Sequence, residues 1–157
     1  MRRHDREVTD SAKIAQIIAE NRVLRLAMVE NGAPYIVPMN YGFSIENDKY
    51  IFYIHSATAG RKVEILQSNP QVAIEIDDKH QLTGEGDACE FSYNYRSIIA
   101  EGTAGFITDT AEKIVCLQKL MFNHTGSKFE ITEKHTVGVA LIRIEITNLS
   151  CKINGYN

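Results

Sequence analysis

One stretch of the sequence combines hydroxyl, glycine and cationic residues in an order that suits a phosphate group. It reads HSATAGRKVE at residues 55–64 and joins the end of an expected strand to the start of an expected helix. The first turn of a helix carries partial positive charge and favours carboxylates, yet here it carries Arg61 and Lys62. A bound anion would reverse this unfavourable placement, because both cations and the free backbone N–H groups near Gly60 can bind phosphate oxygens.

Two hydroxyl groups strengthen this interpretation. Ser56 and Thr58 offer further donors, and the guanidinium of Arg61 can bind two oxygens at once. Each charge-assisted hydrogen bond would contribute roughly 1.5 to 3 kcal/mol. The alternative is a solvated helix start with incidental basic residues, since a cation near a helix N-terminus costs only about 0.3 to 1 kcal/mol. On local physics alone, both interpretations stay open.

His55 is the residue of this stretch best suited to proton chemistry. It ends a hydrophobic strand directly before the expected phosphate loop. An imidazole there can donate a hydrogen bond to a ligand, and its protonation changes near neutral pH. A structural histidine that only completes a hydrogen-bond network is the alternative. His124 and His135 have no partner that the sequence identifies.

Two other polar groups contain reactive residue types without a supporting pattern. The first is a set of acidic residues with one histidine: Glu75, Asp77, Asp78 and His80. Carboxylates do bind hard metals, but this set straddles a strand end and a turn, where solvated charge is normal, so we expect no metal site. The second is Cys89 in a polar loop. A thiol nucleophile needs a neighbouring base and a lowered pKa, and the sequence shows neither.

Three helices are expected to position these residues. The first begins after Thr9 or Asp10, either of which can cap free backbone N–H groups. A short second helix spans about 60–68, and Thr108 or Thr110 caps the third. Their apolar faces show helical spacing and consist of Ile14, Ile17 and Ile18; Val63, Ile65 and Leu66; and Ile114, Leu117, Leu120 and Met121.

Segments with a hydrophobic period of two predict the strands. They lie at residues 23–29, 34–43, 49–55, 72–77, 95–108 and 137–147. Asn31-Gly32 favours a hairpin turn between the first two, because both residues tolerate positive φ. Residues 79–94 are polar, include Gly84 and Gly86, and are expected to form a long excursion from the sheet.

About six consecutive antiparallel strands with few helices favour a closed or nearly closed barrel, which leaves no exposed edge. A parallel doubly wound sheet would need a helix between most strands, and this chain lacks them. The 157 residues contain no repeat or linker-like composition, so we expect a single domain over 1–157. The expected fold class is therefore mainly β (α+β), a six-stranded antiparallel barrel with flanking helices.

Charge and cysteine usage disfavour several classes of protein. Lys and Arg total 17 against 20 Asp and Glu, a net charge of −3, which argues against a nucleic-acid binder with a basic face. Cys89, Cys116 and Cys151 form no Cys-x-x-Cys pair, so a disulfide framework is not expected and a reducing compartment fits. No segment approaches the roughly 18 to 20 apolar residues that span a bilayer, and residues 1–7 lack the apolar run of a signal peptide. We expect a cytoplasmic protein.

Four motifs in a fixed order resemble the pyridoxamine 5'-phosphate oxidase-like FMN-binding split barrels. They are YIVPMNYG at 35–42, YIFYIHS at 50–56 followed by GRK at 60–62, NP at 69–70, and YRS at 95–97 leading to GTA at 102–104. The resemblance covers roughly residues 1–147. Within the superfamily, RRHDRE at 2–7, RLAM at 25–28 and the HS pair at 55–56 resemble the 5-nitroimidazole reductase branch.

This resemblance implies an FMN-binding homodimer with its flavins at the subunit interface. Arg61 and Lys62, next to Gly60, would hold the FMN phosphate. The residues implied to line the flavin ring come from three segments: Val37, Pro38, Met39 and Asn40; Tyr53, Ile54, His55 and Ser56; and Arg96 with Ser97, which would approach from an adjacent strand. His55 is the implied catalytic residue. The C-terminal residues 150–157 lack the basic and aromatic tail with which the true oxidases engage pyridoxal phosphate, so pyridoxamine phosphate oxidation is not expected.

The leading hypothesis is an FMN-dependent reductase of a small nitroaromatic or related compound. The flavin would supply the redox chemistry and the protein its orientation. A reduced nicotinamide would reload the flavin transiently, since no Gly-x-Gly-x-x-Gly segment occurs. One alternative is a non-catalytic carrier or sensor that holds FMN or haem. Another is an oligonucleotide-binding barrel, which would need aromatic residues along a basic groove.

Overall fold

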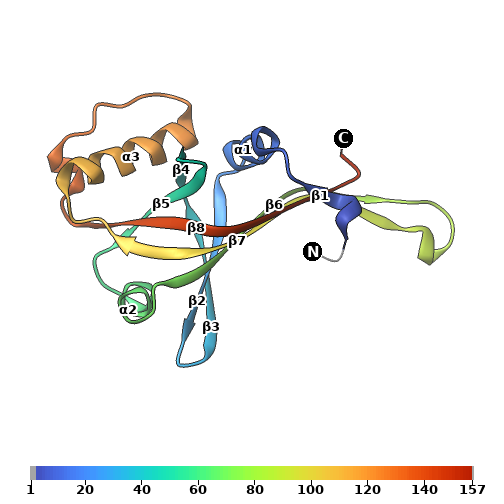
Figure 1. Ribbon diagram of the computed structural model, residues 1–157, viewed down its shortest axis with the longest axis horizontal. Coiled ribbons are helices and arrows are strands. Elements are labelled where there is room, and N and C mark those ends of the chain that lie inside the picture. Colours follow the sequence, from blue (N-terminus) through green and yellow to red (C-terminus); the bar gives the residue numbers. More distant parts are fainter. Residues whose placement is uncertain (1–2, 157) are drawn as a thin grey trace.

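Eight antiparallel strands form one sheet within residues 3–156, the part of the chain that the computed structural model describes (Figure 1). Met1, Arg2 and Asn157 lie outside it, and so does the first residue of the RRHDRE motif. The strands are β1 Glu7–Val8, β2 Val23–Glu30, β3 Ala33–Asn40, β4 Gly42–Glu46, β5 Lys49–Ala57, β6 Gln71–Thr83, β7 Ser92–Phe106 and β8 Val139–Asn154. The α-helices are α1 Ser11–Glu20, α2 Arg61–Ser68 and α3 Thr110–Thr125.

The strand order is β3-β2-β6-β7-β8-β5-β4, with β1 paired to β8. β3 and β4 end this order, and no pairing among the described residues joins them, so the sheet is open rather than closed. The mainly β class with flanking helices is confirmed. The expected number of six strands is wrong, because segment 34–43 divides into β3 and β4 and because β1 adds a short strand.

The division of segment 34–43 occurs at Tyr41, which tertiary contacts hold outside any strand. The Tyr41 hydroxyl donates to the Ile18 carbonyl at 2.6 Å, and the Tyr41 carbonyl accepts from Asn123 Nδ2 at 3.0 Å. At the next residue, a side chain on Gly42 would lie 2.4 Å from the backbone N of Leu120 in α3. Segment 34–43 therefore pairs with β2 before Tyr41 and with β5 after it.

β6 and β7 are longer than their sequence patterns predicted. They form one long hairpin, whose outer part replaces the excursion expected at residues 79–94 (Figure 1). A register shift between Asp78 and Gln81 separates the inner from the outer part. The outer strands carry polar residues on both faces, so the period of two that reveals a half-buried strand is absent from the sequence.

The main core fills the inner face of the curled sheet. Its members from the first helix and first long strand are those that the sequence predicted: Ile14, Ile17, Ile18, Leu24, Leu26 and Met28. Asp10 caps α1 by accepting a hydrogen bond from the Ala12 backbone N–H at 2.8 Å. The expected first helix is therefore confirmed, with its start at Ser11.

α3 covers the other face of β4 and β5 over a smaller core. Its N-cap is Asp109, whose side chain accepts from the Glu112 N–H at 2.8 Å, so the expected caps Thr108 and Thr110 are wrong. The helix is also rotated from the expected orientation. It buries Cys116, Leu120 and Asn123, while the other expected positions, Ile114, Leu117 and Met121, are only half-buried.

Candidate functional site

The strand pairing of the sheet is interrupted between β3 and β5, starting at Tyr41. β3 pairs only with β2, and β4 pairs with β5 only as far as Tyr53, opposite Gly42. Residues 54–57 of β5 therefore keep an edge without a β4 partner. Since only Tyr41 separates β3 from β4, these two unpaired edges meet at one corner, and we call this interruption of the hydrogen-bonded sheet the split.

Two prolines determine what the β3 edge can offer. Pro34 and Pro38 have no backbone N–H, so in a paired strand their backbone groups belong on the side that faces away from β2. Because successive strand residues alternate, the backbone groups of Ile36 and Asn40 also face away from β2. Carbonyl acceptors therefore outnumber N–H donors along the split. The backbone groups of Val37 and Met39 pair with β2, and their half-buried side chains pack against the core.

α2 begins beside the split with an uncapped N-terminus. Gly60 precedes it with φ 125°, no side chain caps the helix, and a Cβ at this position would meet nothing within 4 Å. The carbonyl of Gly60 accepts from the Glu64 N–H at 3.1 Å, as in a regular first turn. The N–H groups of residues 61–63 have no partner within the helix and are open to a ligand.

Lys62 is a half-buried cation beside this helix start. Its Nζ lies 3.1 Å from the Met39 sulfur, and no carboxylate of residues 3–156 lies within 4 Å of it. Burial lowers the pKa of the Lys62 ammonium. A thioether is only a weak acceptor, so the ammonium lacks the anionic partner that a partly buried charge requires.

Arg61, unlike Lys62, is exposed and has a carboxylate partner. Its guanidinium lies 2.8 Å from Glu30 Oε2 and stacks 4.3 Å from the centre of the Tyr35 ring. The side chain is 55% exposed, and such surface ion pairs are worth about 0 to 1 kcal/mol. A phosphate can therefore compete with Glu30 for Arg61.

His55 lies on the exposed side of β5 at the corner of the split. It alternates with Ile51 and Tyr53, which α3 covers, so all three point to the same face of the strand. In the register of β4 and β5, Tyr53 is the last paired residue, opposite Gly42, so His55 lies two residues farther along, on the unpaired part of β5.

His124 of α3 approaches the same corner and was not linked to His55 by the sequence. Leu120 contacts the chain at Gly42, and Asn123 donates to Tyr41, so α3 runs toward the His55 end of β5. The Nε2 atom of His124 is buried and has no hydrogen-bond partner in the described chain. Burial lowers the pKa of the His124 imidazole, and the charges of Arg22 and His55 lower it further.

Two of the residues predicted to line the flavin ring have buried side chains that cannot contact a ligand at the split. Tyr53 is buried, and its hydroxyl donates to Glu46 at 2.8 Å. Ile54 is fully buried in the main core. Only their backbone atoms are available at the split. Ser56 is half-buried at the strand end, between His55 and the phosphate loop.

Arg96 and Ser97 do not meet the other predicted residues within one chain. β7 lies between β6 and β8, so it is not adjacent to β3 or β5, and the expected approach from an adjacent strand is wrong for a single chain. The Arg96 side chain is 7% exposed and pairs with Asp78 and Glu20. Asp78, which binds Arg96, lies beyond Val23, the first residue of β2. Arg61 contacts Glu30, the last residue of β2, so Arg96 and Arg61 lie at opposite ends of this strand.

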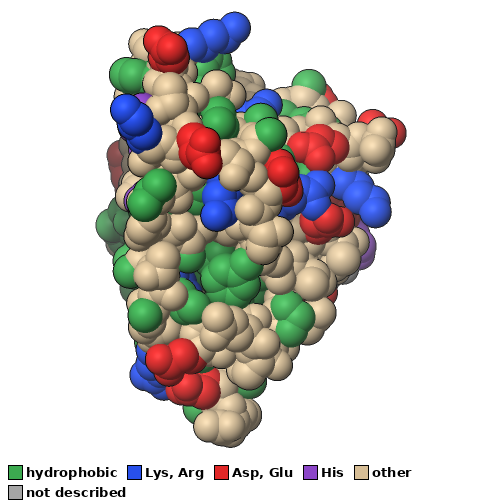
Figure 2. All heavy atoms as spheres, turned by 90° about the vertical axis from the view of Figure 1, so that its left-hand side faces the viewer, with side chains coloured by type: hydrophobic (Ala, Val, Ile, Leu, Met, Phe, Trp, Pro, Cys, Tyr) green, Lys and Arg blue, Asp and Glu red, His purple; other side chains and the backbone are tan. Residues whose placement is uncertain are grey.

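Figure 2 shows the side of the molecule that carries α3 above and α2 below. Hydrophobic side chains gather in the middle of this face, and charged side chains lie toward its top and its lower tip. An apolar surface next to a few polar groups is the common setting of a small-molecule site. The described residues contain no group of three or more His, Cys, Asp or Glu side chains that could hold a metal ion. No helix among them is long and apolar enough to cross a membrane.

Comparisons with solved structures identify similar folds. A protein of Bacteroides thetaiotaomicron, described as a candidate 5-nitroimidazole antibiotic resistance protein, is 29% identical with a TM-score of 0.80, over 94% of this chain and 86% of that one. The flavocytochrome Anf3 of Azotobacter vinelandii is 22% identical with a TM-score of 0.79, over 99% and 72% of the two chains. An FAD- and haem-binding protein of Mycobacterium smegmatis is 19% identical with a TM-score of 0.81, over 96% and 74%.

The last two identities are low enough that they establish the fold alone. A comparison with curated protein sequences found no significant match. Residues 10–153, however, match the family model described as pyridoxamine 5'-phosphate oxidase. Since this match extends over nearly all of the described residues and the sheet is open between β3 and β5, the chain belongs to the pyridoxamine 5'-phosphate oxidase family and has its split-barrel fold.

Proposed function

We propose that this protein is an FMN-dependent oxidoreductase that reduces a small nitroaromatic compound or a chemically related one. The observation that carries the proposal is Lys62, a half-buried cation without a counter-ion in the described chain, at an uncapped helix N-terminus. A phosphate group would satisfy the ammonium and the free N–H groups together. The family match supports the flavin, and the similarity to the Bacteroides protein supports the substrate class.

Two groups of residues in this chain would bind FMN, one at its phosphate and one at its ring. Lys62, Arg61 and the N–H groups after Gly60 would hold the phosphate, with Ser56 beside them. The carbonyl groups of Pro38 and Asn40 face the split and would accept hydrogen bonds from the ring. When bound, FMN supplies the electron transfer.

His55 is the residue that would deliver a proton to the substrate, because it is exposed at the corner of the split. Ser97 and the backbone of Arg96 would reach a flavin only from a second copy of the chain, since the Arg96 side chain is held by Asp78 and Glu20, so the proposal includes a homodimer. A reduced nicotinamide would serve as the electron donor and would bind transiently at the exposed face of the flavin.

The phosphate site is tested by titrating the apoprotein with FMN and following flavin fluorescence. We expect Lys62→Gln to raise the Kd for FMN by about 10-fold to 100-fold, the equivalent of one charge-assisted hydrogen bond. Lys49→Gln, which removes an exposed lysine at the start of β5, is the matched control and should leave the Kd unchanged. Circular dichroism checks that both variants keep the fold. Wild-type affinity in Lys62→Gln would refute the phosphate site.

A second measurement separates an enzyme from a carrier. Under anaerobic conditions, a reduced nicotinamide should bleach the flavin absorption of the loaded protein, and a 5-nitroimidazole should restore it. His55→Gln should keep the flavin and lower the rate of reoxidation by about 100-fold or more. A bound flavin that no nicotinamide reduces, or a haem spectrum from the purified protein, would instead favour the carrier or sensor that holds FMN or haem on the same barrel.

A further inference from the structure

Arg22 differs from every other arginine of residues 3–156, because it has no carboxylate within 4 Å and each of the others forms an ion pair. Its Nη1 donates to the carbonyls of Ala19 and Asn21 at the end of α1. The Nε and Nη2 atoms have no partner in the described chain. Together they form a side of the guanidinium that can bind a carboxylate with two parallel hydrogen bonds. The contacts with α1 therefore occupy Nη1 and leave this side available to a ligand.

The Arg22 side chain borders a hollow between α1, β4 and α3. The hollow has a volume of about 350 Å³, and its lining includes Arg22, Phe43, Lys119 and Phe122. Cavities of this size hold small organic molecules. None of the residues proposed to bind FMN lines it, so a ligand here would be bound in addition to the flavin.

Lys119 is a second cation of this hollow. It is half-buried, and Lys79 is the one lysine of residues 3–156 that has a carboxylate within 4 Å. Two positive charges that face one hollow repel each other, and a partly buried charge without a partner is unfavourable. The whole chain has a net charge of −3, so a general excess of positive charge does not explain this pair. An anionic group in the hollow would satisfy both cations.

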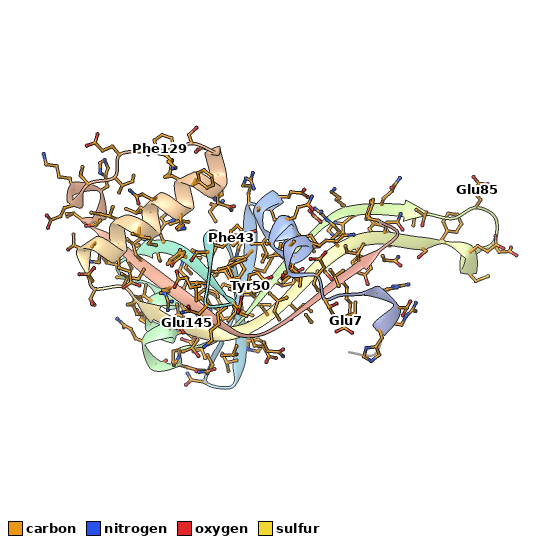
Figure 3. All side chains as sticks on the ribbon, turned by 45° about the horizontal axis from the view of Figure 1, so that its top comes forward. Glu7, Phe43, Tyr50, Glu85, Phe129 and Glu145 are labelled. Atoms are coloured by element: carbon orange, nitrogen blue, oxygen red, sulfur yellow. The ribbon has the colours of Figure 1, made fainter. Side chains whose placement is uncertain are left out.

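Phenylalanine rings give the hollow an apolar wall. Phe43 is half-buried on β4, and Phe122 of α3 is 53% exposed. The hollow adjoins a groove of about 370 Å³, which shares Lys119 and Phe122 and adds Lys128 and Phe129. In the view of Figure 3, Phe129 and Phe43 lie on opposite sides of α3. Aromatic side chains provide a large contact area for a flat apolar molecule, so this surface suits a ligand that combines a ring with a negative charge.

We propose that the hollow binds a small aromatic carboxylate. The carboxylate accepts hydrogen bonds from Nε and Nη2 of Arg22 and forms an ion pair with the Lys119 ammonium. The ring of the ligand packs against Phe43 and Phe122, and a longer apolar body extends into the adjoining groove. This binding site is independent of the proposed flavin chemistry, because it uses none of the same residues.

Binding of naphthalene-2-carboxylate tests the proposal directly. The protein is saturated with FMN, so that the flavin site is filled, and the acid is titrated by isothermal titration calorimetry. We expect a Kd of about 0.1 mM or lower, an ordinary affinity for a ligand of this size. The neutral naphthalene-2-carboxamide should bind at least about 10-fold more weakly, because it cannot form the ion pair. Equal affinity for acid and amide, or no measurable binding of the acid, would overturn the proposal.

Lys119→Gln and Arg22→Gln locate the carboxylate. Each should raise the Kd for the acid by about 10-fold and leave the Kd for the amide within about 2-fold of wild type. The matched control is Lys113→Gln, which removes a half-buried lysine of α3 that lines neither the hollow nor the groove, and it should change neither Kd. Circular dichroism checks that all three variants keep the fold. Wild-type affinity for the acid in both Lys119→Gln and Arg22→Gln would refute the site.

Phe122→Ala tests the apolar wall. It should raise the Kd for the acid and for the amide alike, by about 5-fold, because both ligands lose the same ring contact. Phe91→Ala removes a ring of similar exposure, 46%, between β6 and β7 and should leave both values unchanged.

A titration without FMN separates this site from the flavin site. The Kd for the acid should be the same with and without FMN. A lower Kd in the absence of FMN would place the acid at the flavin site and contradict the proposal. The binding of FMN itself is measured in parallel, so failure of the carboxylate site is distinguished from failure of the proposed function.

Discussion

At the residue scale, Lys62 and His124 face the same physical problem. Each is partly buried, each lacks a hydrogen-bond partner of opposite charge in the described chain, and burial lowers the pKa of both. In a folded protein, buried polar atoms are nearly always paired. The Lys62 ammonium without an anionic partner and the unpaired Nε2 of His124 therefore identify a region suited to a polar ligand.

The charge of His55 is predicted to suppress protonation of His124. His55→Gln removes a positive charge that lowers the pKa of His124, so the pKa of His124 should rise in this variant. The readout is an NMR titration of the histidine ring signals in the flavin-free protein. Lys49→Gln serves as the control for a remote loss of charge. An unchanged pKa of His124 would show that the two imidazoles are too far apart to interact.

The sequence could identify some of these residues and not others. Arg61 and Lys62 are unusual at a helix start, and that local anomaly is visible in the sequence. The burial of Lys62 is not, because it depends on Met39, which is distant in sequence. Likewise, His124 reaches the split only through the packing of α3 on Gly42, a contact without a local signal.

At the scale of elements, the start of α3 depends on Asp109. Asp109→Ala should lower the free energy of unfolding by about 1 kcal/mol, because it leaves the Glu112 N–H without its acceptor. Thr108→Ala is the matched control and should cost much less. Urea denaturation measures both changes. A larger loss for Thr108→Ala would mean that the cap lies there, as the sequence pattern suggested.

The contact between β4 and α3 leaves no room for a side chain at Gly42. A Cβ would lie 2.4 Å from the Leu120 backbone, so Gly42→Ala must move the helix or the strand and should destabilise the fold by about 1 to 3 kcal/mol. Gly105→Ala has nothing within 4 Å of its Cβ and should cost far less. Thermal unfolding followed by circular dichroism compares the two. Equal stability of both variants would contradict the tight packing.

Elements with a strong hydrophobic period were predictable, and those that tertiary contacts shape were not. The stripe of α1 and the alternation of β2 were visible as patterns, and both are confirmed. The break at Tyr41 has no such signal, since contacts with Ile18 and Asn123 cause it. The outer part of the β6–β7 hairpin was missed because its strands have no buried face of their own to impose a period.

At the scale of the whole molecule, Arg96 ties α1 to the middle of the sheet. It pairs with Glu20 of α1 and with Asp78 of β6. Arg96→Met should lower the free energy of unfolding at pH 7 by about 3 to 5 kcal/mol, because it leaves the Asp78 carboxylate partly buried and without its cation. Arg25→Met, which removes a more exposed ion pair, should cost about 1 kcal/mol or less.

The stability that Asp78 provides should disappear in acid. Burial opposes its ionisation, but hydrogen bonds from Arg96 and Asn21 outweigh burial and lower the pKa of its carboxyl. A lowered pKa in the folded state adds stability above the unfolded value of about 3.9, and this is lost as the pH falls through the folded value. Wild type and Arg96→Met should therefore differ less at pH 3 than at pH 7 in urea denaturation. A constant difference would assign the loss to packing alone.

The prolines of β3 also bear on how this protein stays in solution. An exposed strand edge with a full row of donors and acceptors is a template for strands of other molecules, and long edges of that kind promote aggregation. Pro34 and Pro38 interrupt the row of donors at regular intervals, so a foreign strand could form only part of its ladder there. The split can thus remain open to a small ligand while it resists the growth of an intermolecular sheet.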